Sequence, residues 1–192
     1  MKRIILLLVA VVGFMAVQAQ QHVEFKWHRM YWVAGYDFST NINKMTYEDK
    51  ATFHDFYAIC GWQIRKESGV GFGVEYKMDV TGGYSQLPVF VEVRSHYLRN
   101  QLTPFTAAYV GYSIPLGMTG GTDKVTHIQK GGPTWGLNVG VRYAITRNYG
   151  VSAFVGYQGI FLDRVQLYEE GKLQNSLRVL MQNVKVGVGF NF

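Results

Sequence analysis

The last ten residues of the chain alternate between apolar and polar positions without a break. Because successive side chains of a β-strand point to opposite faces, this period of two predicts a strand with one apolar and one polar face. The apolar positions, which end on an aromatic residue, are Val184, Val186, Val188, Phe190 and Phe192. Such a strand suits a wall between lipid and a polar lumen.

Seven further segments of about ten residues show the same alternation, and stretches rich in turn residues separate them. The clearest are 135–143 and 149–157, whose aliphatic stripes have an aromatic residue at each end. Aromatic girdles on both sides of an aliphatic band are typical of the two interfaces of a membrane. The other predicted strands cover 30–38, 55–64, 70–79, 89–97 and 104–114. The first and the fifth strands are less regular, because aromatic residues occur on both faces.

The connections between these strands alternate in length. Short ones cover 66–69, 99–102 and 146–148; long ones cover 39–52, 116–132 and 163–178; and 81–86 is a brief exception. Outer-membrane barrels have short periplasmic turns and longer outer loops. We therefore predict an all-β fold, an eight-stranded antiparallel up-and-down transmembrane β-barrel with both termini in the periplasm.

The first nineteen residues have the organisation of an export signal. Lys2 and Arg3 precede a short apolar run, and Val17-Gln18-Ala19 offers a small-residue cleavage site. The run is shorter than the roughly 20 residues that a membrane-spanning helix needs. We predict a signal peptide at 1–19 and one barrel domain at 20–192, located in the outer membrane of a Gram-negative cell.

Composition narrows the class of protein. The chain has 22 Gly, 13 Tyr and 12 Phe but only 17% charged residues, which for an exported chain favours a barrel over a helical membrane protein. The single cysteine, Cys60, can form no intramolecular disulfide. Loss of the signal lowers the formal net charge of +6 by two units, and no basic cluster with interleaved aromatics follows, so we expect no nucleic-acid partner.

On these features the mature chain resembles the small eight-stranded outer-membrane barrels, the group that includes the OmpA transmembrane domain, OmpX and OmpW-like proteins. The resemblance rests on the signal, the strand count, the girdles and the terminal aromatic residue. It implies that the last strand is a signal read by the barrel-assembly machinery, with Val186, Val188, Phe190 and Phe192 matching that pattern. It also implies contact with outer-membrane lipid. The resemblance identifies an architecture and not an activity.

The charged residues of the predicted strands fall on the polar face. They are Asp55, Glu75, Lys77, Asp79, Glu92, Arg94, Arg142 and Lys185. A hairpin register that pairs Lys77 with Glu92 would also pair Glu75 with Arg94. This lumen charge network could form a gated ion path or a polar ligand site. The simpler interpretation is a salt-bridged plug, because side chains fill the interior of an eight-stranded barrel and buried charges need partners.

No catalytic or metal-binding arrangement stands out. Some small barrels act on lipid A, which needs a serine activated by a histidine and a carboxylate. His96 and Ser95 are adjacent and so point to opposite faces, and the same holds for His54 and Asp55. The remaining histidines, His22, His28 and His127, have no serine partner in the pattern, and no ligand spacing indicates a metal. We expect no enzyme activity, no catalytic residues, no cofactor and no metal.

Three functions stay open. The leading hypothesis is a monomeric outer-membrane barrel with a plugged polar lumen and a structural, surface-interaction or adhesion role. A surface partner would contact the outer loops, which contain Tyr47, Glu48, Asp49, Lys50, Tyr168, Glu169 and Glu170. The second is a narrow pore or small-solute channel. The third is a soluble lipocalin-like barrel that binds an apolar ligand inside.

Overall fold

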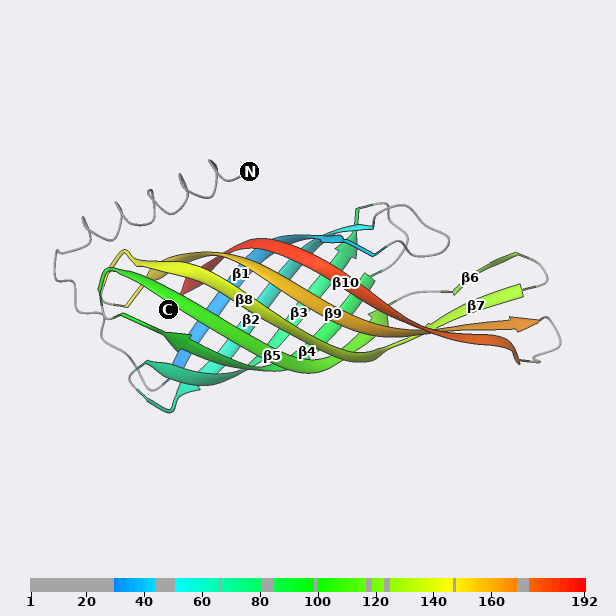
Figure 1. Ribbon diagram of the computed structural model, residues 1–192, viewed down its shortest axis with the longest axis horizontal. Helices are drawn as coiled ribbons and strands as arrows, with labels where there is room; N and C mark the ends of the chain where they lie inside the picture. Colours follow the sequence, from blue (N-terminus) through cyan, green and yellow to red (C-terminus); the bar gives the residue numbers. More distant parts are fainter. Residues whose placement is uncertain are drawn as a thin grey trace.

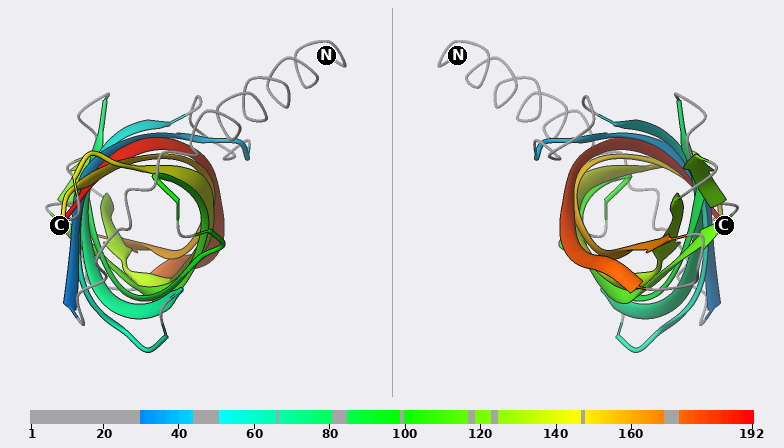
Figure 2. Two further views of the ribbon diagram at one scale, coloured as in Figure 1. Left: turned by 90° about the vertical axis from the view of Figure 1, so that its left-hand side faces the viewer. Right: turned by 90° about the vertical axis from the view of Figure 1, so that its right-hand side faces the viewer.

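A computed structural model describes residues 30–43, 51–65, 67–80, 85–98, 100–116, 119–122, 125–146, 148–168 and 173–192. Eight long strands form a closed antiparallel ring, as Figure 2 shows in views along the barrel. This confirms the predicted all-β, eight-stranded up-and-down barrel. The predicted signal peptide, 1–19, lies outside the described residues. Within those residues, no helix is long and apolar enough to cross a membrane.

The eight barrel strands follow one another around the ring in chain order. They are β1 (Met30–Asn41), β2 (Thr52–Gln63), β3 (Ser68–Asp79), β4 (Ser85–His96), β5 (Leu102–Leu116), β8 (Gly132–Ala144), β9 (Gly150–Tyr168) and β10 (Leu173–Asn191). Each pairs with the next, and β10 pairs with β1 to close the ring. We call the end that carries Met30 and Phe192 the terminal end, and the opposite end the loop end.

Two stretches predicted as long loops are largely strand, and this is a correction. The stretch 116–132 contains β6 (Thr119–Thr122) and β7 (Val125–Lys130), which pair as a hairpin. The stretch 163–178 lies mostly in β9 and β10, which run on beyond the barrel wall. There β7 replaces β8 as the neighbour of β9, so the four strands form a sheet that projects from the loop end (Figure 1). Both stretches were assigned as outer loops, but the pairing available along β9 makes them strand.

The barrel is apolar outside and polar inside, the reverse of a soluble globular protein. On β10 the five apolar residues of the terminal pattern are exposed, while the residues between them are buried. The two irregular strands follow the same rule: Asp37 of β1 and Tyr109 of β5 face inward, whereas Trp32 and Val110 are exposed. Cys60 lies on the outward face of β2, as predicted.

The strands are strongly staggered. A row of paired residues that starts at Asn41 passes through Asn183, Gln158, Gly136, Tyr109, Glu92, Gly71 and Gly61 and returns to β1 at Tyr31, ten residues away. With eight strands, this stagger corresponds to a tilt of about 40° from the barrel axis. The interior is consequently narrow enough for side chains to fill it.

Inward glycines make room for the large interior side chains. A Cβ atom on Gly136 would lie 2.3 Å from Cζ of Tyr109, and one on Gly73 would lie 2.3 Å from Cε2 of Phe90. The tyrosine and phenylalanine rings therefore lie flat over strand backbone, a position that is open only where the facing residue lacks a side chain. Polar and aromatic interior residues can pack in the same narrow lumen for this reason.

We expect Gly136→Leu to destabilise the barrel by about 1–3 kcal/mol, because the new side chain must displace the ring of Tyr109. The midpoint of urea unfolding in detergent micelles measures the change. Val139→Leu, on the exposed face of the same strand, is the matched control and leaves the midpoint nearly unchanged. Equal midpoints for the two variants would contradict this account of the packing.

Candidate functional site

All eight predicted lumen charges lie on the inner face of the wall, and none exposes more than 7% of its surface. The structure adds Asp37 of β1, which is 1% exposed and which the prediction omitted. The odd-numbered positions Val33, Gly35, Asp37 and Ser39 share one face of β1, and this pattern could have identified Asp37 as an inward charge. Aromatic residues on both faces of the strand obscured the pattern.

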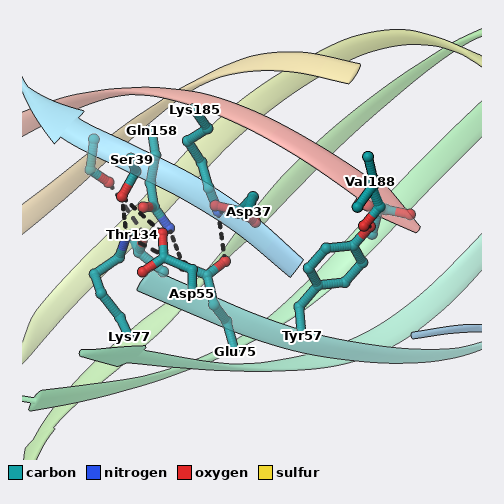
Figure 3. A network of polar contacts seen from close by, with 12 residues as sticks. Asp37, Ser39, Asp55, Tyr57, Glu75, Lys77, Thr134, Gln158, Lys185 and Val188 are labelled. Carbon is teal, nitrogen blue, oxygen red and sulfur yellow. Dashed lines mark hydrogen bonds and ion pairs between the residues drawn. The ribbon is translucent and has the colours of Figure 1, made fainter. Parts of the chain in front are cut away.

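Five of these charged residues form one network inside the lumen, the central network (Figure 3). Lys77 Nζ lies 2.5 Å from Asp55 Oδ2 and 3.4 Å from Glu75 Oε1. Lys185 Nζ lies 2.7 Å from Glu75 Oε2 and 3.2 Å from Asp37 Oδ2. Glu75 therefore links the two lysines, and Lys185 reaches from β10 across the lumen to β3.

Neutral side chains add hydrogen bonds to this network. Ser39 Oγ donates to Asp55 Oδ2 at 2.7 Å and accepts from Lys77 Nζ at 2.8 Å. Gln158 Nε2 donates to Glu75 Oε1 at 3.4 Å. Three carboxylates thus share two ammonium groups and several neutral donors. Such dense pairing is what buried charges require, because an unpaired charge in a dry interior is strongly unfavourable.

A second ion pair lies closer to the terminal end. Arg94 Nε lies 2.8 Å from Glu92 Oε1, and Arg94 Nη2 lies 3.4 Å from Glu92 Oε2, so the pair is formed within β4. The Arg94 guanidinium carbon also lies 4.9 Å from the centre of the Phe105 ring. These contacts fix the guanidinium against the inner wall.

The predicted cross-strand pairing is wrong. Neither Lys77 with Glu92 nor Glu75 with Arg94 forms a pair, because the β3–β4 register places Gln86 opposite Lys77 and Gly71 opposite Glu92. The reason is the hairpin, since β4 already begins at Ser85 within the stretch that was taken as a connection. The partner of Lys77 therefore lies six residues earlier on β4 than predicted.

Apolar layers lie on both sides of the central network. Toward the loop end, a buried cluster consists of Ala51, Phe53, Ile160, Leu162 and Met181. Toward the terminal end, a larger cluster consists of Val33, Tyr57, Ile59, Phe90, Phe105, Ala107, Tyr109 and Phe154. The cavity between this cluster and the network has room for about one water molecule. In the described residues, the lumen is closed by packed side chains at several levels.

The other candidate residues are not brought together. His96 is buried inside, whereas Ser95 Oγ lies 3.1 Å from Ser68 Oγ on the other face of the wall. Across the described ranges, no group of three His, Cys, Asp or Glu side chains could hold a metal ion. His22, His28, Tyr47, Glu48, Asp49, Lys50, Glu169 and Glu170 lie outside the described residues, while His127 falls in β7 and Tyr168 ends β9.

Comparison with known proteins identifies the architecture. No family model matches the chain, and no curated protein matches it. Among solved structures, Neisserial surface protein A is similar, with a TM-score of 0.64, 13% identity, and coverage of 85% of this chain and 96% of that one. The fold is that of the small eight-stranded outer-membrane barrels.

Two structures from Pseudomonas aeruginosa are similar to the chain as well. The outer membrane protein OprG matches with a TM-score of 0.62 and 11% identity, over 89% of this chain and 99% of that one. The N-terminal β-barrel domain of OprF matches with a TM-score of 0.55 and 12% identity, over 87% of this chain and 100% of that one. At these identities the similarity concerns the fold alone. It confirms the architecture that the sequence resemblance implied.

We expect Lys185→Met to destabilise the barrel by about 3–5 kcal/mol, because it leaves Asp37 and Glu75 buried without their shared ammonium group. The double variant Lys185→Met with Glu75→Gln recovers part of the loss, since it removes a charge together with its partner. Urea unfolding in micelles measures both variants. Lys130→Met, at an exposed lysine, is the control, and a single variant as stable as this control would contradict the network.

Proposed function

We propose that the protein is a monomeric, non-enzymatic outer-membrane barrel whose closed lumen has a structural role and whose loop-end sheet is an interaction surface outside the cell. The observation that carries this proposal is the ion-pair network that spans the lumen between two apolar layers. A lumen filled in this way supports a structural role more than transport of solutes through the barrel. Because β10 pairs with β1, the barrel wall has no unpaired strand edge that a second chain would have to cover.

The exterior supports insertion in a lipid bilayer. Toward the terminal end, exposed aromatic side chains include Trp32, Trp62, Tyr97, Tyr143 and Tyr149. Toward the loop end, Phe38, Phe56, Tyr76, Tyr112 and Trp135 form the other girdle. Exposed aliphatic residues such as Val139 and Val186 lie between them. The girdles match the two interfaces of a membrane, and a soluble lipocalin-like barrel would need the opposite distribution.

The network lies at the level of the loop-end girdle. Asp37 lies between Tyr36 and Phe38 in β1, and Glu75 and Lys77 flank Tyr76 in β3. Each inward charge is thus next to an outward aromatic residue that suits a membrane interface. The loop-end cluster and the projecting sheet lie beyond this level, which supports placing them outside the bilayer.

The projecting sheet supports the surface role. Strands β6, β7, β9 and β10 extend the wall beyond its barrel portion (Figure 1), and sheets of this kind offer edges for pairing with another chain. The outward residues of β10, among them Val186 and Phe190, support recognition by the barrel-assembly machinery as part of the same proposal.

The orientation is tested by cysteine labelling in whole Gram-negative cells. In a Cys60→Ser background, we expect a membrane-impermeant maleimide to label Val80→Cys in intact cells, because this exposed residue directly follows β3 at the loop end. Glu67→Cys, in a terminal-end turn, reacts only after the outer membrane is permeabilised. The reverse pattern, or recovery of the chain in the soluble fraction, would overturn the proposed location.

The closed lumen is tested by conductance in planar bilayers. We expect the refolded native chain to insert without discrete channels, because packed side chains fill the lumen at several levels. Glu75→Ala and Arg94→Ala are measured beside it, and channels in these variants alone would identify the charges as part of the seal. Regular channels in the native protein would instead favour the narrow-pore alternative.

A further inference from the structure

The terminal end holds a pocket that none of the functions above uses. Its inner part is lined by Tyr31, Gln63, Arg94, His96, Arg142 and Asn191. Its outer part is lined by Met30, Trp32 and Phe192, which are among the exposed hydrophobic residues of the barrel exterior. The pocket is open and has room for about two water molecules or one small anionic group. It therefore joins the lumen to the lipid-facing surface across the rim.

The inner part of the pocket is cationic. The guanidinium groups of Arg94 and Arg142 line it, and the lining residues include no aspartate or glutamate, although Glu92 of β4 pairs with Arg94 from outside the lining. The ion pair with Glu92 and the ring of Phe105 orient Arg94. Arg142 is 3% exposed and lies over Gly150, where a Cβ atom would be 3.1 Å from Nε. Guanidinium groups suit phosphate or carboxylate oxygens. Because Nε and Nη2 of Arg94 donate to Glu92, Arg94 would contribute its remaining N–H groups to such a ligand.

The rim of the pocket is apolar and part of the barrel closure. Trp32 N donates to Phe192 O at 2.7 Å, and Phe192 N donates to Trp32 O at 3.0 Å, so the two residues form a pair between the ends of β1 and β10. Their side chains are 47% and 46% exposed. A hydrocarbon chain lying over them would gain the free energy of apolar burial, about 0.8 kcal/mol for each buried CH₂ group.

Tyr31 forms the boundary between this pocket and the rest of the lumen. Its ring lies over three inward glycines, because a Cβ atom on Gly61, Gly69 or Gly71 would lie between 2.3 and 3.0 Å from ring or hydroxyl atoms. The same ring packs against the buried cluster that contains Tyr57, Phe90 and Phe105, which we call the aromatic cluster. The hydroxyl is buried and has no hydrogen-bond partner among the described residues.

We propose that this pocket binds the anionic head group of a membrane amphiphile, with phosphate or carboxylate oxygens at Arg94 and Arg142 and the hydrocarbon chain over Trp32 and Phe192. The coexistence of a cationic interior and an apolar, lipid-facing rim in one pocket carries the proposal. A small inorganic anion would use only the inner half of the pocket, and a neutral amphiphile only the outer half. The site lies at the membrane level of the terminal end, where such molecules are concentrated.

The test uses the refolded mature chain in neutral maltoside micelles. Dodecyl phosphate, dodecanoate, inorganic phosphate and dodecanol are titrated separately, and native mass spectrometry with isothermal titration calorimetry gives the stoichiometry and affinity. We expect one dodecyl phosphate or dodecanoate to bind at least tenfold more tightly than inorganic phosphate or dodecanol. Inorganic phosphate binding as tightly as dodecyl phosphate would overturn the amphiphile assignment.

Substitutions locate the site. We expect Arg142→Gln to weaken dodecyl phosphate binding at least tenfold, whereas Arg65→Gln, at an exposed arginine of the same end, leaves it within twofold. Trp32→Ala weakens binding of the amphiphile, and Trp62→Ala, on the neighbouring strand and outside the pocket lining, does not. Circular dichroism and heat-dependent gel mobility verify folding of each variant. Equal losses in a variant and its matched control would overturn the proposal.

Discussion

The closure of β1 onto β10 with a stagger of ten residues is the constraint on which the other features depend. Closure pairs the backbone of each barrel strand with both of its neighbours, as contact of the wall with lipid would require. The same stagger fixes the radius, so the interior can hold side chains but little else. Large inward residues therefore lie over glycines, as Tyr109 does over Gly136, and every inward charge must find its partner inside.

The central network also constrains the register of the barrel. Buried ion pairs are weak evidence for stability, because desolvation offsets much of their attraction. Their effect on alternative strand registers is larger. A slip of one residue would turn Asp37, Asp55 or Glu75 toward lipid and an apolar neighbour toward the lumen. Because Lys185 bonds acids on two strands, a slip of β10 would break two pairs together. The network thus favours a single register over its neighbours.

Alternation along the chain was sufficient to predict the fold, the number of barrel strands and the face of each of the eight lumen charges. It was not sufficient to predict partners, because period two carries no information about how far adjacent strands slide past each other. The β3–β4 hairpin illustrates this: one early strand start at Ser85 replaced the predicted ion pairs. The pair within β4, between Glu92 and Arg94, and the long reach of Lys185 depend on side-chain conformations that no pattern encodes. The projecting sheet was missed because the long stretches 116–132 and 163–178 were assigned as outer loops, and the sequence pattern does not show which segments pair beyond the barrel wall.

The interior changes character along the barrel axis, and this asymmetry separates two regions. The loop-end half combines an apolar cluster with the five-residue ion-pair network. The terminal end instead has an open pocket. Its guanidinium groups, Arg94 and Arg142, line it together with Tyr31 and the exposed rim residues Trp32 and Phe192. A solute that entered there would meet the aromatic cluster before reaching the network. The proposed head-group pocket and the proposed interaction sheet thus lie at opposite ends of the barrel.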